Sequence, residues 1–155
     1  MNWLTLLFAT ALAAQAGMSK LEAISMIETG NNDRAVGRAG EVSRYQIKPS
    51  VWKRYSASRN YHDHRLSAWV AAQYLEQLEA SFLRQAGRPP TDFDRYVLWN
   101  GGPSYYQRLG YASHRVHPTI RKRAARFANL RALSIEEQDR RARWIASVNT
   151  LAPTQ

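Results

Sequence analysis

The stretch that decides the fold spans residues 19–49 and reads SKLEAISMIETGNNDRAVGRAGEVSRYQIKP. It opens with Ser19 followed by Glu22, a capping-box pattern that predicts the start of a helix. Gly30 is the residue type that most often ends one. From Thr29 to Gln46 the composition turns to glycine, asparagine and aspartate, which favours turns and a short β-hairpin. The stretch therefore predicts a short helix that leads into an irregular segment able to carry a site.

Glu28 occupies the last turn of this predicted helix, on the face that also carries Leu21 and Ile24. The negative end of the helix dipole and the apolar neighbours both disfavour a charged carboxylate at this position. A carboxyl group that keeps its proton near neutral pH can serve as the general acid of glycoside cleavage. Position alone does not establish that role, because an ordinary surface glutamate at a helix end has the same placement.

The rest of the chain also has the pattern of a helical protein. We expect a proline-started helix over 49–55, a long amphipathic helix over 65–85, and a further helix that Thr91 caps. Two more helices are expected over 118–130 and 134–149. The candidate core residues of the long helix are Leu66, Trp69, Val70, Leu75, Leu78 and Phe82. The fold class is therefore expected to be mainly α, with one short irregular or hairpin segment after the first helix.

The first sixteen residues carry no charged side chain, and residues 4–14 form an apolar run of the length found in signal peptides. Residues 14–16 read AQA, a small-x-small cleavage pattern. We expect residues 1–16 to be a signal peptide cleaved after Ala16, residues 17–155 to be one domain, and the protein to be periplasmic or secreted. A buried N-terminal helix is the alternative. No run is long and apolar enough for a transmembrane segment to be expected.

The chain has 22 Lys and Arg against 12 Asp and Glu, a net charge of +10. Such an excess attracts anionic partners, among them nucleic acid, acidic lipid surfaces and the carboxylate-bearing polymers of bacterial walls. Much of it lies from residue 108 onward, where a solvated helix face explains most of the arginines. The absence of cysteine excludes a disulfide framework and a thiol nucleophile. At 155 residues the chain can bury one core without disulfides.

Three blocks of sequence carry a resemblance to one enzyme family. They read IETGNNDRAV at 27–36, AGEVSRYQIKP at 39–49 and VLWNGGPS at 97–104. The first resembles the Glu-Ser-Gly-x-Asn-Pro-x-Ala-Val signature of the lytic transglycosylases. The second resembles their Ala-Gly-Ala-x-Gly-Leu-Met-Gln-Ile-x-Pro segment, and the third resembles their Ala-Tyr-Asn-Ala-Gly-Pro-Gly stretch. All three stand in the order of the family, and the resemblance covers about residues 19–104.

The resemblance implies a lysozyme-like helical domain that acts on peptidoglycan. It implies that Glu28 protonates the β-1,4 glycosidic oxygen between N-acetylmuramic acid and N-acetylglucosamine, then acts as a base toward the muramyl C6 hydroxyl, which gives a 1,6-anhydromuramyl product. The substrate supplies its own nucleophile, so no metal and no cofactor is expected. The substrate-binding candidates are Gln46, Asn100, Tyr45, Trp99, Tyr105 and Glu41. The expected partners are glycan strands and other cell-wall proteins, with the chain itself a monomer.

The chain departs from the family pattern in two of the blocks. Glu41, Ser43, Arg44 and Tyr45 stand in place of Ala, Gly, Leu and Met, and Trp99 stands in place of Tyr. Trp99 keeps an aromatic plate but lacks the hydroxyl. Glu41 adds a carboxylate that could activate water and convert the enzyme into an inverting, lysozyme-type hydrolase. A structural role for Glu41, pairing with Arg44 or capping a turn, is the simpler expectation.

Three other functions stay open on the sequence. A hydrolase would use both Glu28 and Glu41. A non-catalytic wall-binding protein would keep the lysozyme-like fold but lack activity. The altered residues around Gln46 suggest this alternative. A nucleic-acid binder would explain the late arginines, but it explains neither the three blocks nor the N-terminal segment. We therefore expect no nucleic acid among the partners.

Overall fold

The computed structural model describes residues 18–132 and residue 140. Its elements are, in order, α1 (Lys20–Thr29), α2 (Pro49–Trp52), α3 (His64–Ala86), α4 (Asp92–Gly101), α5 (Pro103–Arg108) and the 3-10 helix η1 (Ser113–Arg115). The chain is helical again over residues 118–132. The prediction of a mainly α fold is confirmed. The predicted signal peptide lies outside the described residues, as does the predicted helix over 134–149 apart from residue 140, which is helical.

The first helix, α1, begins and ends where the sequence predicts. The Ser19 hydroxyl accepts a hydrogen bond from the Glu22 amide, and the Glu22 carboxylate accepts one of 2.7 Å from the Ser19 amide, which completes the capping box. Gly30 adopts a left-handed conformation with φ 65°, and its amide donates to the Met26 carbonyl. Glu28 is therefore placed one residue before the helix end.

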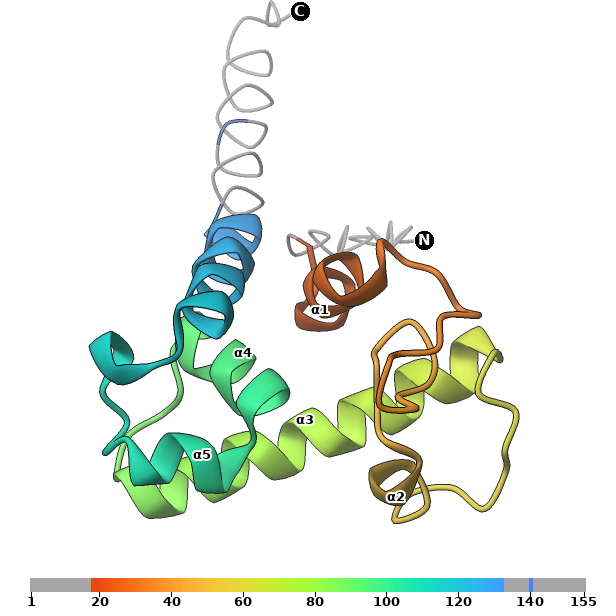
Figure 1. Cartoon of the computed structure of the whole chain (residues 1–155), viewed down its shortest axis with the longest axis horizontal. Coiled ribbons are helices and arrows are strands. Elements are labelled where there is room, and N and C mark those ends of the chain that lie inside the picture. The colour runs from red at the N-terminus through yellow and green to blue at the C-terminus, as the bar shows by residue number, and fades with distance from the viewer. Residues whose placement is uncertain (1–17, 133–139, 141–155) are drawn as a thin grey trace, which may run out of the picture.

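The long helix α3 is the scaffold on which the other helices pack. Figure 1 shows α4 and α5 along its C-terminal half and the segment between α1 and α3 around its N-terminal half. Asp63 caps its start by accepting a 2.8 Å hydrogen bond from the Leu66 amide, and Gly87 ends it in the left-handed conformation. The predicted central helix is confirmed with slightly wider bounds.

The buried stripe of α3 differs from the prediction at one residue. The side chains of Val70, Leu75, Leu78 and Phe82 are buried as expected, and Leu66 is partly buried. Trp69 is 50% exposed, so its placement in the core is wrong. Ser67 and Ala71 complete the buried stripe, and at 100° per residue Trp69 falls on the opposite side of the helix. Within residues 18–132, neither α3 nor any other helix is long and apolar enough to cross a membrane.

The segment after α1 forms a compact set of turns with little sheet. Val42 bridges Val36 on one side and Ile47 on the other, in antiparallel pairs. The amide of Val42 donates to the Ile47 carbonyl at 2.9 Å and the reverse bond is 3.0 Å. Ser43 and Gln46 have positive φ angles of 66° and 51°, which close the tight turn between the bridges. The predicted hairpin is thus reduced to isolated bridges, because successive turns leave no room for longer strands.

Two helices differ in length from the prediction. The helix expected over 49–55 ends at Trp52. The chain then folds back so that the Trp52 indole donates a 2.8 Å hydrogen bond to the Ser58 carbonyl and meets the Tyr61 ring edge-on. The helix expected over 118–130 extends at least to residue 132.

A buried carboxylate fixes the start of α4. The Asp94 side chain is 3% exposed, and it accepts hydrogen bonds from Arg88 at 2.7 Å, from the Thr91 hydroxyl at 2.7 Å and from the Tyr106 hydroxyl at 2.6 Å. Burial acts against the Asp94 anion, but the bonds from Arg88, Tyr106 and Thr91 outweigh it and lower its pKa to about 2. Asp94 therefore ties α4 to α5 as an anion at neutral pH.

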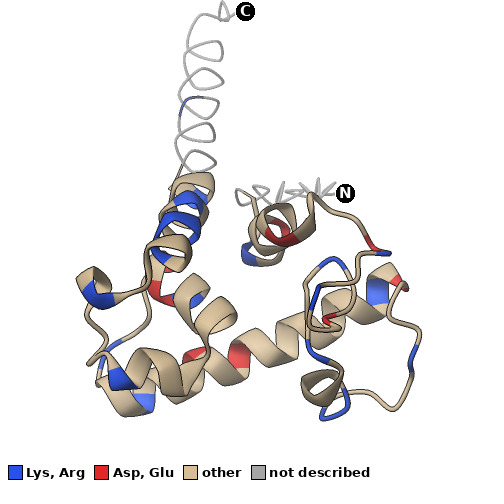
Figure 2. Cartoon of the chain, in the orientation of Figure 1, with Lys and Arg blue, Asp and Glu red and all other residues tan. Residues whose placement is uncertain are grey.

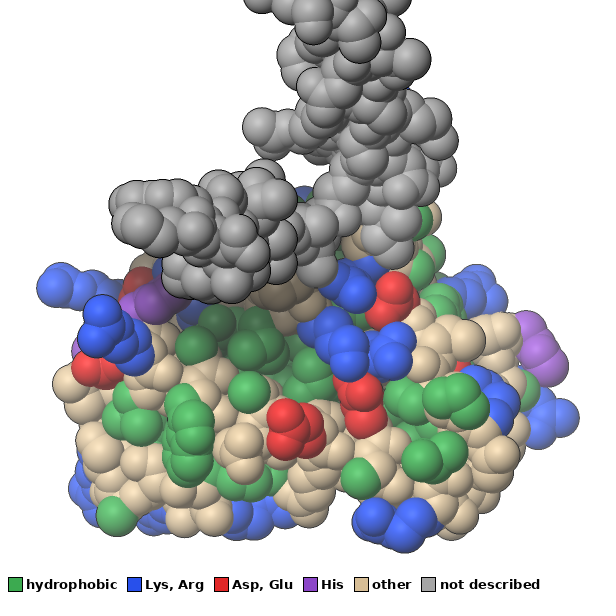
Figure 3. Space-filling model, turned by 180° about the vertical axis from the view of Figure 1, so that it is seen from behind, with side chains coloured by type: hydrophobic (Ala, Val, Ile, Leu, Met, Phe, Trp, Pro, Cys, Tyr) green, Lys and Arg blue, Asp and Glu red, His purple; other side chains and the backbone are tan. Residues whose placement is uncertain are grey.

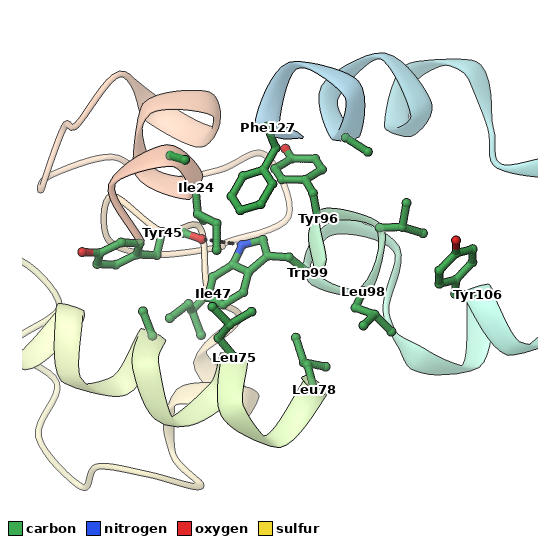
Figure 4. Close-up of a cluster of buried hydrophobic side chains, with 14 of the residues drawn as sticks. Ile24, Tyr45, Ile47, Leu75, Leu78, Tyr96, Leu98, Trp99, Tyr106 and Phe127 are labelled. Carbon is green, nitrogen blue, oxygen red and sulfur yellow. Dashed lines mark hydrogen bonds between the residues drawn. The ribbon is translucent and has the colours of Figure 1, made fainter. Parts of the chain in front are cut away.

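The core next to the site joins segments from the whole described chain. Figure 4 shows Trp99 between Ile24, Ile47 and Leu75, which belong to α1, the turn segment and α3. Figure 4 also shows Tyr96 against Phe127, whose ring centroids lie 5.8 Å apart. This packing holds α4 against both α1 and the helical segment 118–132.

Candidate active site

A cavity of about 460 Å³ opens between the end of α1, the turn segment and the end of α4. Its walls include Glu28, Glu41, Gln46, Trp99 and Asn100, which come from all three sequence blocks. The other lining residues are Gly37, Arg38, Ile47, Lys48, Val51, Tyr74, Gly101, Gly102 and Arg123. The fold therefore brings together a carboxyl group and two amide side chains that are distant in sequence.

Glu28 is not an ordinary surface glutamate, because its side chain is 7% exposed. Its Oε1 accepts a 2.7 Å hydrogen bond from the Tyr96 hydroxyl, and its Oε2 lies 3.7 Å from Nη1 of Arg123. Burial raises the pKa of Glu28 above its usual value, and the nearby Glu41 charge adds to this. Tyr96, Arg123 and Asn100 favour the anion and offset part of the rise. The net effect is a carboxyl that keeps its proton to higher pH than a free glutamate.

Tyr96 holds one oxygen of this carboxyl in place. Burial raises the pKa of the Tyr96 phenol, and the charge and hydrogen bond of Glu28 raise it further. The phenol is therefore protonated throughout the physiological range and acts as a donor to Oε1. This leaves Oε2 of Glu28 as the oxygen that can carry a transferable proton.

The end of α4 supplies one wall of the cavity. Asn100 is exposed and Trp99 is nearly buried, with its indole N–H donating a 3.2 Å hydrogen bond to the Tyr45 carbonyl. Gly101 packs against Tyr105 so closely that a Cβ on Gly101 would lie 2.5 Å from the ring. The Tyr105 hydroxyl accepts a hydrogen bond of 2.8 Å from the His117 amide. Tyr105 thus supports the glycine wall from behind and is not among the residues that line the cavity.

The turn segment supplies the opposite wall. Gly37 lies where any side chain would collide with the Glu41 carboxylate and the Gln46 amide oxygen, so only glycine lets the two groups approach. Gln46 donates a 3.1 Å hydrogen bond from Nε2 to the Ser43 carbonyl. The Glu41 carboxylate accepts one of 3.1 Å from the Ala39 amide, so the predicted turn-capping role of Glu41 is confirmed.

The predicted pairing of Glu41 with Arg44 is wrong. Arg44 instead binds Asp33 through two hydrogen bonds of 2.6 and 3.0 Å, and this guanidinium is the main reason that the pKa of Asp33 is lowered. The Arg44 carbonyl also accepts a 3.0 Å hydrogen bond from the Thr29 hydroxyl. Arg44 therefore fastens the turn segment to the end of α1, beside Glu28.

Tyr45 does not lie where a substrate-binding role would need it. It is 3% exposed and belongs to the buried core, and it is not part of the cavity wall. Its backbone carbonyl contributes instead, because that oxygen accepts the Trp99 indole proton and fixes the position of this ring.

Several residues of the site were not singled out from the sequence. Tyr96 lies one helical turn before Asn100, and this spacing is a signal that could have placed Tyr96 beside the site. Arg38, Lys48 and Arg123 carry no such local signal, because arginines and lysines are frequent throughout this chain.

Comparisons with protein-family models, with curated proteins and with solved structures give no match to this chain.

Proposed function

We propose that this protein is a lysozyme-like enzyme that cleaves the glycan strands of peptidoglycan, acting as a lytic transglycosylase with Glu28 as its acid. One observation carries the proposal. Glu28 is a buried carboxyl with a raised pKa, held by Tyr96 at the wall of a cavity that also contains the amides of Gln46 and Asn100. Action on the wall requires export, which the expected signal peptide over residues 1–16 would provide.

The proposed reaction uses one carboxyl group twice. Oε2 of Glu28 donates its proton to the glycosidic oxygen while the bond from this oxygen to the muramyl C1 breaks. The carboxylate then accepts the proton of the muramyl C6 hydroxyl as that oxygen bonds to C1, which closes the 1,6-anhydro ring. Protons balance, because Glu28 ends protonated as it began. Tyr96 stabilises the intermediate carboxylate through its bond to Oε1.

The other lining residues fit a sugar substrate. Gln46 and Asn100 each offer an amide donor and an acceptor, which suit sugar hydroxyls and N-acetyl groups. Tyr74 lines the cavity and provides aromatic surface on which a sugar ring can pack, and the nearly buried Trp99 ring lies beside it with ring centroids 5.2 Å apart. Ile47 and Val51 add apolar wall that excludes water from one side.

The test is digestion of purified sacculi followed by mass spectrometry of the released sugar ends. Wild type is expected to release 1,6-anhydromuramyl ends, and Glu28→Gln is expected to lose about 100-fold or more in rate because a carboxamide has no acidic proton to transfer. Glu76→Gln is the matched control, because Glu76 is an exposed glutamate of α3 outside the cavity. Equal rates for Glu28→Gln and Glu76→Gln would end the proposal.

A hydrolytic reaction is the second candidate, and the position of Glu41 favours it. Glu41 lines the same cavity as Glu28 and is close enough to raise its pKa by charge. A carboxylate across the cavity from the acid can act as base toward water, as in inverting glycosidases. The same digestion of sacculi distinguishes the hydrolase from the transglycosylase. Reducing ends that disappear in Glu41→Gln support the hydrolase, whereas anhydro ends that persist in Glu41→Gln support the transglycosylase.

A further inference from the structure

The candidate active site has more positive charge than its proposed chemistry needs. Arg38, Lys48 and Arg123 line the cavity together with the two glutamates. When Glu28 is protonated, three cations therefore face the single carboxylate of Glu41. On the face shown in Figure 3, Lys and Arg side chains lie along the edge and also in the middle, where they adjoin acidic side chains. A neutral polysaccharide gives no reason for such an arrangement.

Arg123 is the cation nearest the acid. It belongs to the helical segment 118–132, which carries five basic residues and no acidic one. Figure 2 shows the Lys and Arg residues of this segment in blue. Ala124 and Phe127 of the same segment are fully buried and anchor it against the core. The Arg123 side chain itself is 45% exposed. Its position is therefore set by the fold, while its guanidinium is open to the cavity.

The contact between Arg123 and Glu28 is loose. The separation of 3.7 Å from Nη1 to Oε2 is an ion-pair distance but not a hydrogen bond. Within residues 18–132, no hydrogen bond or ion pair joins Arg38 or Lys48 to an acidic side chain either. The planar fork of a guanidinium suits two hydrogen bonds to one carboxylate, and Arg123 makes no such paired contact with Glu28.

A cation in loose ion-pair contact with a general acid works against catalysis, because it favours the anion and promotes loss of the proton that must be donated. An anion bound to that cation would cancel the effect. A substrate that brings its own carboxylate into the cavity would therefore satisfy Arg123 and return the proton to Glu28 in the same step.

We propose that Arg123, with Arg38 and Lys48 beside it, binds a carboxylate of the glycan and so makes the cavity select acidic over neutral saccharides. The inference rests on the proposed function, because it assumes that a glycan occupies the cavity. A carboxylate in this place has two sources in peptidoglycan, the lactyl group of a muramic acid without peptide and the acidic groups of a stem peptide. Arg123 is in this view a specificity-determining residue, and Glu28 keeps the catalytic role.

The experiment measures binding of three thio-linked tetrasaccharides that cannot be cleaved, by calorimetry at low and high salt. One is the neutral N-acetylglucosamine tetramer, the second carries free lactyl carboxylates, and the third carries stem peptides. Arg123→Gln is compared with Arg126→Gln, an exposed arginine of the same segment outside the cavity. Arg123→Lys, which keeps the charge without the fork, is a second variant in case the first folds poorly by circular dichroism.

We expect wild type to prefer an acidic ligand, and Arg123→Gln to weaken that binding about 10- to 100-fold while leaving the neutral tetramer unaffected. Arg123→Lys should lose less, and Arg126→Gln should match wild type. If Arg123→Gln weakens binding of the second ligand alone, the bound carboxylate is the lactyl group. If it weakens binding of the third ligand alone, the bound carboxylate belongs to the stem peptide. Equal effects on neutral and acidic ligands overturn the inference. If the effects are equal and wild type still cleaves sacculi, only this inference is wrong. If wild type binds none of the three ligands, the proposed function is wrong as well.

Discussion

Replacing Tyr96 by phenylalanine removes a single hydroxyl group next to the proposed acid. The lost interaction is a 2.7 Å hydrogen bond to Oε1 of a carboxyl that is 7% exposed. A hydrogen bond to a charged group is worth about 1.5–3 kcal/mol. That energy corresponds to about a 10- to 100-fold change in the ratio of protonated to ionised Glu28 at a given pH. Because the bond favours the anion, Tyr96→Phe should keep Glu28 protonated to higher pH.

The assay is the pH dependence of kcat/KM with solubilised glycan strands. Activity that needs a protonated Glu28 falls as pH rises through its pKa, and in Tyr96→Phe this fall should move upward by about 1–2 pH units. Tyr106→Phe is the matched control, because the Tyr106 hydroxyl binds the buried Asp94 outside the cavity in the same manner. It should change the melting temperature without moving the pH profile. An unchanged profile in Tyr96→Phe would refute the idea that Glu28 titrates as the acid.

Three further predictions concern the site and its support. Gly37→Ala should push the Glu41 and Gln46 side chains aside and lower kcat/KM about tenfold. Because the flexible ends of these side chains can move, the free energy of unfolding from a denaturant titration should fall by at most about 1 kcal/mol. Asp94→Asn should cost about 2 kcal/mol in the free energy of unfolding at neutral pH, because the folded pKa of about 2 lies below the ordinary value of 3.8. This contribution of Asp94 is present above 3.8 and is lost as pH falls toward about 2, so wild type and variant should converge in acid. The contribution of Glu28 to stability has the opposite pH dependence, because its raised pKa stabilises the fold below pH 4.5, the ordinary value, and this stabilisation is lost as pH rises. The melting temperature of Glu28→Gln should therefore exceed that of wild type near pH 8 and equal it near pH 4. A lower melting temperature than wild type at both pH values would contradict the burial of this carboxyl.

Local signals predicted the first helix and the scaffold well. The reciprocal bonds of Ser19 and Glu22 involve residues three apart, and the left-handed turn of Gly30 depends on its own lack of a side chain. The bounds of α3 follow in the same way from the cap residue Asp63 and from Gly87. Interactions of this range need no knowledge of the rest of the molecule, so a reading of neighbouring residues suffices.

Predictions of side-chain contacts were wrong where tertiary packing decides which residues lie close together. Trp69 has the residue type of a core position but faces solvent, because it lies on the side of α3 opposite to the stripe that packs against the rest of the chain. Arg44 pairs with Asp33 and not with Glu41, because the turns between them bring the former pair within 2.6 Å. Tyr45 contributes its carbonyl to the site while its ring joins the core.

The sequence by itself determined which chemical groups are available, the helices that carry them, and the placement of Glu28 at a helix end. Only the tertiary structure decided that this carboxyl is buried and meets Tyr96, which is 68 residues away in the chain. It also decided that Arg123 lines the cavity whereas the exposed Lys122 and Arg126 of the same segment do not. The physical reason is that a pKa depends on the solvent and charges within a few ångströms, and long-range packing sets that environment.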